Sequence, residues 1–88
     1  MFVLSRTPGQ SILIDDLEVT VGWIRFNKVQ LLINDPETEV PAEEILYLNE
    51  KIEPALEISI LVIQITADKV RLGIESPPGT QVTRREVS

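Results

Sequence analysis

Three arginines lie at the ends of apolar segments and have the chemistry to recognise guanine or phosphate. Arg6 closes an apolar stretch near the amino terminus, and Arg84 and Arg85 are adjacent near the carboxyl terminus. A guanidinium group donates two hydrogen bonds to guanine O6 and N7 or to phosphate, and it stacks on unpaired bases. Alternatively, these arginines are solvent-facing edge residues that oppose strand association. Adjacent strand residues point to opposite faces, so only one of Arg84 and Arg85 can face a given site.

Adjacent carboxylates are the other pattern with chemical potential, at Asp15 and Asp16 and at Glu43 and Glu44. In turns and at a helix start, such pairs are usually solvated turn formers or partners of the helix dipole. The chain has no His and no Cys, so the commonest nucleophile–base pairs and zinc sites cannot be assembled. We therefore expect no enzymatic activity, no metal and no cofactor.

The composition indicates one small all-β domain. A chain of 88 residues buries only about 60–70% of its unfolded surface, so its core is thin. With 43% apolar residues but only one Trp, one Tyr and two Phe, that core depends on Val, Ile and Leu, which suit pleated sheets. The net charge of −6 opposes non-specific attraction to a polyanion, so any contact with RNA must be local. The amino terminus does not resemble a signal peptide and the apolar runs are shorter than a membrane span, which predicts a cytoplasmic protein.

Alternating apolar residues and turn signals predict most of the elements. The predicted strands are Phe2–Arg6, Ser11–Ile14, a longer strand from Leu17 that carries Trp23 on its apolar core-packing face, Val29–Asn34, a second hairpin within 58–77, and Gln81–Val87. After Pro41, the spacing of Ile45, Leu46, Leu48 and Ile52 predicts a short amphipathic helix that Pro54 ends. The predicted fold class is thus all-β, mostly antiparallel, with one short α-helix.

The chain contains an internal duplication. Residues 17–36 and 58–77, aligned 41 positions apart, share seven identities in twenty positions. Two unrelated hairpins with the same strand-turn-strand pattern are the alternative. We predict a single domain, 1–88, with a first repeat at about 1–46, a helix or linker at about 43–57 and a second, partial repeat at about 58–88.

The segments "MFVLSRTPGQSILIDDLEVTV" and "KVRLGIESPPGTQVTRREV" resemble the opening strands and the closing half of the carbon storage regulator family, known as CsrA or RsmA. Its members are small RNA-binding proteins that form interleaved β dimers. The resemblance implies interleaved sheets, here within one chain as a monomeric pseudo-dimer. A sheet edge left by missing strands could instead be covered by a second chain, giving a homodimer.

In that family, RNA is held by the opening strand of one subunit and the closing strand of the other. Carried over to this sequence, the resemblance implies an RNA site made of Leu4, Ser5, Arg6, Val82, Thr83, Arg84 and Arg85. The family's second opening-strand Arg is Thr7 here, its His is Thr83, and a family Glu is Arg85. A second site is expected to be lost, because Ala42 or Glu43 stands where the family's closing-strand Arg would fall and the second half has no recognisable opening strand.

The resemblance implies a translational repressor that holds a GGA-like loop in the leader of an mRNA and competes with the ribosome. Its partners are then single-stranded or hairpin-loop mRNA, with one RNA site per chain. The alternative is an acidic protein-interaction module that modulates a conventional CsrA-like protein or binds a protein antagonist without holding RNA. The net charge favours this alternative, whereas the strands around Arg6 and Arg84 favour RNA.

Overall fold

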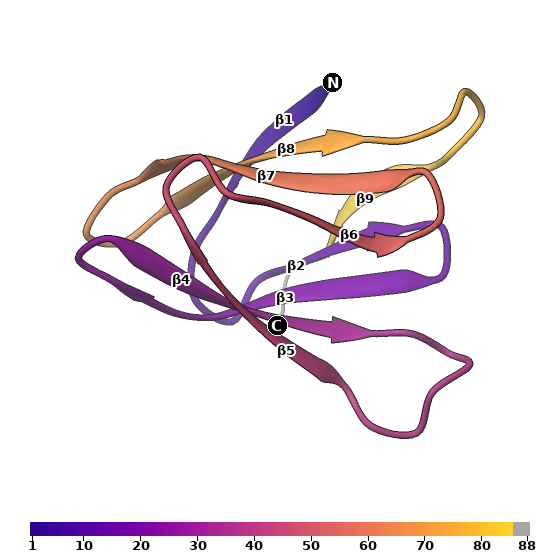
Figure 1. Ribbon diagram of the computed structural model, residues 1–88, viewed down its shortest axis with the longest axis horizontal. Coiled ribbons are helices and arrows are strands. Elements are labelled where there is room, and N and C mark those ends of the chain that lie inside the picture. Colours follow the sequence, from indigo (N-terminus) through magenta and orange to yellow (C-terminus); the bar gives the residue numbers. More distant parts are fainter. Residues whose placement is uncertain (86–88) are drawn as a thin grey trace.

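The computed structural model describes residues 1–85 and contains two antiparallel β-sheets that pack face to face (Figure 1). The strands are β1 (Phe2–Arg6), β2 (Ser11–Ile14), β3 (Leu17–Arg25), β4 (Lys28–Asn34), β5 (Ala42–Tyr47), β6 (Lys51–Ala55), β7 (Ile58–Ile65), β8 (Val70–Glu75) and β9 (Val82–Arg85). A four-stranded sheet has the order β1-β8-β7-β6, and a five-stranded sheet has the order β5-β4-β3-β2-β9. The predicted all-β class is confirmed.

One core lies between the two sheets and is built from aliphatic side chains. Along β3, buried Leu17, Val19 and Val21 alternate with more exposed residues, as the period of a strand with one covered face requires. The remaining buried apolar residues are Leu4, Ile12, Ile14, Val29, Leu31, Ile33, Leu46, Ile60, Val62, Val70, Leu72 and Ile74. The core therefore draws on both halves of the chain.

The two halves exchange their outermost strands. β1, from the first half, pairs with β8 in the second, with Leu4 opposite Leu72. β9, from the second half, pairs with β2 in the first, with Ile12 opposite Arg84. Each sheet is thus completed by a strand from the other half of the chain.

The two hairpins of the duplication share an irregularity as well as a sequence pattern. The ladder between β3 and β4 shifts register between Val21 and Ile24, and the ladder between β7 and β8 shifts between Val62 and Gln64. Val21 and Val62 are 41 positions apart, so the bulge occurs at the same place in both hairpins. A bulge is a feature that related chains tend to keep, so its repetition supports the duplication.

The bulge also corrects the prediction that Trp23 packs in the core. Because the bulge adds a residue to β3, Ile24 rather than Trp23 packs against the core beyond Val21. Trp23 is half-buried, and the guanidinium carbon of Arg25 lies 4.7 Å from its ring centroid. Simple alternation fails here because a bulge reverses which residues face the core.

The predicted helix after Pro41 is wrong, because that segment forms β5 and β6. Leu46 is buried opposite Val29 of β4, while Ile45 remains exposed. A short run of apolar residues fits helical and extended periods alike, and here the pairing of β5 with β4 decides in favour of a strand. Asn49, with φ of 69°, allows the tight turn into β6, and Pro54 is accommodated in β6 because this strand is at the edge of its sheet.

The other predicted strands are confirmed at or within a few residues of their ends. The prediction for the last strand extended to Val87, and its final residues lie outside the part of the chain that the structure describes. Among residues 1–85 there is no helix of the length and apolarity that crossing a membrane requires.

A single core shared by the two halves predicts equal costs for equivalent truncations. Leu31 and Leu72 are 41 positions apart and both have no exposed surface, so Leu31→Ala and Leu72→Ala should each lower the free energy of unfolding by about 2–5 kcal/mol. Urea denaturation checks this, with Leu56→Ala as the control. Leu56 is 90% exposed, so its replacement should change stability by about 0.5 kcal/mol or less. A negligible cost for either core variant would contradict the shared core.

Candidate nucleic-acid interface

β1 and β9 end the two sheets on the same side of the sandwich. β1 is the last strand of the four-stranded sheet, and β9 is the last strand of the five-stranded sheet, next to β2. The loop between β1 and β2 is short, and Gly9, with φ of 90°, donates its N–H to the Val21 carbonyl at 2.7 Å. This loop ties the two edges together, so the opening and closing strands that the resemblance implies belong to one surface.

β1 divides its predicted site residues between the two faces of the strand. Leu4 is opposite Leu72 and is 2% exposed, so it belongs to the core. Arg6 shares that inner face and is 5% exposed, whereas Ser5 is exposed on the outer face. Direct contact with a ligand from β1 is therefore available to Ser5 and to the free backbone edge of the strand.

Arg6 is held within the protein. Its Nε donates to the Ser5 carbonyl at 2.7 Å, and one terminal nitrogen donates to the Ser11 carbonyl at 3.4 Å. Ser11 begins β2, and its hydroxyl shares a hydrogen bond with Thr20 on β3. The Arg6 guanidinium thereby links the end of β1 to the start of β2, the strand with which β9 pairs.

β9 presents its predicted site residues differently. Val82 is half-buried against the core, and Thr83 and Arg84 are exposed. Because Arg84 is opposite buried Ile12, it shares the face of the sheet that meets the other sheet, on the side where β1 also ends. An exposed guanidinium at this edge is free of the constraints that hold Arg6.

Arg85 points to the opposite face of β9. Its terminal nitrogen donates to the Glu18 carboxylate at 2.9 Å across β2, and the Arg85 side chain is 61% exposed. Such an exposed pair contributes little to stability, at most about 1 kcal/mol. Of the two adjacent arginines, Arg84 is therefore the one directed towards the edge that β9 shares with β1.

One residue of this surface was missed from the sequence. Arg71, on β8, is exposed and lies directly opposite Ser5 on the outer face of the four-stranded sheet. It falls in the middle of the duplicated hairpin, where packing is the expected role of most residues. Its counterpart in the first repeat is the neutral Gln30, and this difference between the repeats was the available signal.

The opposite side of the sandwich ends in β5 and β6, and it lacks the equivalent pair of strands. β5 pairs with β4 as β1 pairs with β8, and its turn into β6 is fastened to Val62 as the loop around Gly9 is fastened to Val21. This corrects the expectation that Ala42 and Glu43 belong to a closing segment of the first half, because they lie in a strand that occupies the position of an opening strand. Among the described residues, β6 has no strand on its free edge.

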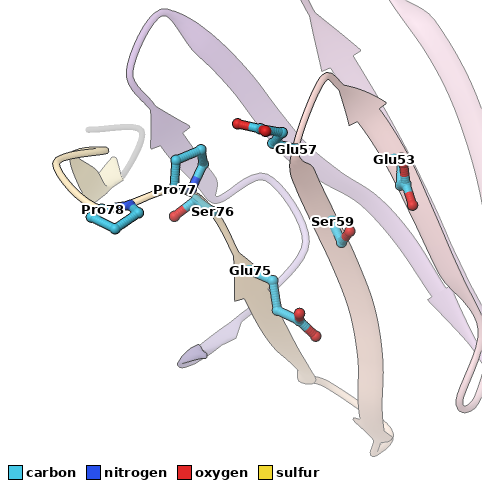
Figure 2. A pocket seen from close by; sticks show the side chains of 7 residues that line it. All are labelled: Glu53, Glu57, Ser59, Glu75, Ser76, Pro77 and Pro78. Atoms are coloured by element: carbon cyan, nitrogen blue, oxygen red, sulfur yellow. The ribbon is translucent and has the colours of Figure 1, made fainter.

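An acidic pocket of about 400 Å³ extends across the four-stranded sheet, from β6 to the loop that follows β8. Figure 2 shows the carboxylates of Glu53, Glu57 and Glu75 around it, with Pro77 and Pro78 at one end. Negative charge opposes the binding of phosphate. No group of three or more potential metal ligands occurs in residues 1–85. This pocket is therefore a poor place for RNA, and the β1 and β9 edges are the candidate interface.

Two interleaved sheets with exchanged edge strands and a duplicated hairpin are the architecture that the resemblance in the sequence implies. The family model CsrA, described as the global regulator protein family, matches residues 1–47 and again residues 41–88. The chain belongs to the CsrA family and contains its unit twice. The second match includes β5 and β6, so these strands belong to the family pattern.

Curated relatives agree with the family assignment. The translational regulator CsrA of Hydrogenovibrio crunogenus is 34% identical over 70 residues, which cover 77% of this chain and 100% of the relative. The translational regulator CsrA of Rhodopirellula baltica is 51% identical over 39 residues, which cover 44% of this chain and 56% of the relative. No solved structure matches the chain. The family is one of regulators rather than enzymes, in line with the expectation from the residue types.

The different surroundings of Arg6 and Arg84 predict opposite effects on stability. Arg6→Ala removes a buried donor and leaves the carbonyls of Ser5 and Ser11 without this partner, so the free energy of unfolding should fall by about 1–3 kcal/mol. Arg84→Ala removes an exposed side chain and should change it by about 0.5 kcal/mol or less. Urea denaturation of both variants measures the difference. Equal stabilities would show that Arg6 does not fasten β1 to β2.

Proposed function

We propose that this protein binds a GGA-type motif in the leader of an mRNA and represses translation by competing with the ribosome for that segment. The observation that supports this most is the placement of β1 and β9 on one side of the sandwich, with Arg84 exposed beside them. Both strands have a free edge, so their backbone N–H and C=O groups are available to the edges of unpaired bases. The names of the curated relatives, translational regulators, agree with this function.

The chemistry of the exposed groups suits guanine in a single-stranded loop. The Arg84 guanidinium can donate to O6 and N7 of one guanine, a pattern that no other base offers. The Ser5 hydroxyl is a further donor and acceptor on β1, whereas the Thr83 hydroxyl lies on the face of β9 that carries Arg85. Arg6 positions β1 relative to β2, and Leu4 and Val82 anchor the two strands in the core.

We further propose one RNA site per chain and a monomeric pseudo-dimer. The side formed by β5 and β6 lacks a closing strand among the described residues, and exposed Glu43 and Glu44 lie on β5. The free edge of β6 is short, contains Pro54 and is interrupted by a bulge between Ile52 and Ala55. These features oppose the addition of another strand, so they favour a chain that stays monomeric.

Replacing the exposed arginine should weaken RNA binding without unfolding the protein. For Arg84→Ala, we expect the dissociation constant for a GGA hairpin to rise about 5- to 150-fold, because a bidentate contact to guanine contributes about 1–3 kcal/mol of discrimination. An electrophoretic mobility shift assay measures this. Lys51→Ala is the matched control, since it removes the same charge from an exposed residue of β6 on the opposite side.

Two outcomes would contradict the proposed site. If Arg84→Ala and Lys51→Ala weaken binding equally, the effect is one of total charge rather than of a contact at β9. If the native chain does not bind the hairpin at micromolar protein, the proposed GGA site is ruled out, and the protein-interaction module becomes the favoured alternative.

The single closing strand predicts the stoichiometry. Native mass spectrometry of the protein with a short GGA hairpin that has no single-stranded flanks should show complexes of one chain and one RNA. An ordinary family dimer has two equivalent sites, so a complex of two chains with two RNAs would contradict the pseudo-dimer. Isothermal titration calorimetry provides the same ratio in solution.

A further inference from the structure

The chain gathers most of its aromatic residues at one end of the five-stranded sheet. It has one Trp, one Tyr and two Phe, and Trp23, Phe26 and Tyr47 all lie where the β3–β4 hairpin turns. Phe26 is 99% exposed and Tyr47 is 46% exposed. Exposed aromatic side chains are costly to leave in water, and they are the groups on which unpaired bases stack.

Basic side chains alternate with these aromatics on the outer face of the sheet. Arg25 is opposite Lys28 in the ladder, and Lys28 is opposite Tyr47, so the three form a row across β3, β4 and β5. Their neighbours Ile24, Val29 and Leu46 face the core, which leaves the row on the outer face. Arg25 also stacks over Trp23 at 4.7 Å. We call Trp23, Arg25, Phe26, Lys28 and Tyr47 the hairpin-tip platform.

The second repeat supplies an internal comparison. The positions 41 residues after Trp23, Arg25 and Phe26 are occupied by Gln64, Thr66 and Ala67. The two hairpins have the same ladder and the same bulge, so the fold does not require aromatic or basic residues at these positions. Lys28 is matched by Lys69, so Trp23, Arg25 and Phe26 are what distinguishes the hairpin-tip platform from the second hairpin, and packing does not require them.

Charge is distributed unevenly between the two ends of the sandwich. Basic residues at or next to the hairpin turns are Arg6, Arg25, Lys28, Lys69 and Arg71. Acidic residues at or near the other end are Asp15, Asp16, Glu18, Asp35, Glu37, Glu39, Glu53, Glu57 and Glu75. Glu50 and Asp68 also lie in turns at the end that carries the aromatics, but the five basic residues outnumber them, so this end is locally basic and its field suits a polyanion.

Three carboxylates near the platform, those of Glu43, Glu50 and Asp68, accept hydrogen bonds from the protein. Glu50 accepts a hydrogen bond from the backbone N–H of Tyr47 at 2.7 Å, and Asp68 accepts one from the Thr66 hydroxyl at 3.4 Å. Glu43 accepts one from the side-chain amide of Gln30 on β4. A cavity of about 410 Å³ lies beside the platform between the two hairpin turns, lined by Ile24, Arg25, Phe26, Ile65, Thr66 and Ala67. Its volume is in the range of small-ligand sites, so it has room for part of a nucleotide.

We propose that the hairpin-tip platform binds single-stranded RNA without sequence preference, by stacking of bases on Phe26, Tyr47 and Trp23 and by contact of Arg25 and Lys28 with phosphate. This combination of a basic surface and aromatic side chains is how proteins bind single strands of any sequence. The proposal rests on the proposed RNA-binding function and extends it, because the platform would hold the single-stranded flank of an mRNA whose GGA loop occupies the β1 and β9 edges.

Trp23 provides the test, since it is the single Trp of the chain and lies in the platform. An oligouridylate of about 10 nucleotides contains no guanine, so it probes the platform without the GGA site. We expect saturable quenching of Trp fluorescence that weakens as salt is raised. Phe26→Ala and Arg25→Gln should each raise the dissociation constant about 5-fold or more, by loss of stacking and of a phosphate contact respectively.

The controls separate base stacking on the platform from non-specific attraction between charges. Leu56→Ala removes a side chain that is 90% exposed and lies in the turn between β6 and β7, at the acidic end, and it should bind as the native chain does. Inorganic polyphosphate lacks bases and should bind more weakly than the oligouridylate. Circular dichroism checks that each variant is folded, which is expected because Phe26 and Arg25 are exposed.

Several results would overturn the platform. These are the absence of quenching by oligouridylate, unchanged affinity of both Phe26→Ala and Arg25→Gln, or binding of polyphosphate or of acidic peptides as tight as that of RNA. Any of them leaves the GGA hairpin without flanks as an independent test of the proposed function. Conversely, failure of that hairpin to bind while oligouridylate binds would remove the GGA site and leave the platform.

Discussion

The exchange of strands between the two halves is the constraint on which the rest of the structure depends. β1 completes the sheet of the second half, and β9 completes the sheet of the first half. Each exchanged strand contributes to the shared core, β1 through buried Leu4 and β9 through half-buried Val82. Each half alone would leave the apolar face of its sheet uncovered. The core and the β1 and β9 surface therefore form together.

This arrangement gives the exchanged strands two roles at once. Along β1, residues that face inward anchor the strand, while Ser5 faces outward and the backbone edge stays free. The period of two that places Leu4 in the core also keeps Arg6 on the inner face, where carbonyl groups hold it. Residues that stabilise the core and residues that are available to a ligand thus alternate along the same strand, and a change of register would exchange their faces.

Most of the fold could be predicted because local signals and long-range pairing agree. Strands β1 to β4 and β7 to β9 carry alternation or turn residues that tertiary contacts then satisfy. The segment after Pro41 could not be predicted, because its few apolar residues fit either period and only the neighbouring β4 selects a strand. The orientation of Trp23 could not be predicted either. The bulge beyond Val21 arises from the pairing of two strands, so the sequence of one strand does not reveal it.

The position of the opening and closing strands at the edges of the sheets could be predicted, but the orientation of their side chains could not. The family resemblance identified the opening and closing segments, and the topology brings them to one side. Cross-strand register determines which side chains are buried or adjacent. It places Arg6 in the interior and Arg71 opposite Ser5. It also sets which of Arg84 and Arg85 faces the inner side of the sheet. A register between residues more than sixty positions apart is set by the packing of the two sheets, which no local sequence pattern encodes.

The uneven charge explains how an acidic chain can belong to a family of RNA-associated regulators. In a duplicated unit, each half is free to change as long as the shared core is kept, because only the inward residues are constrained by packing. The first repeat carries aromatic and basic residues at its hairpin turn, and the second carries Gln64, Thr66 and Ala67 at the same positions. Acidic residues accumulate at the opposite end, where Glu53, Glu57 and Glu75 surround a pocket that begins at β6, whose free edge has no partner among the described residues.

At an ionic strength of about 0.15 M, charges are screened over about 8 Å, whereas the longest axis of the molecule is 32 Å. The acidic end therefore repels a polyanion locally without cancelling the attraction at the basic end, and the net charge of the chain is a poor guide to what each end can bind.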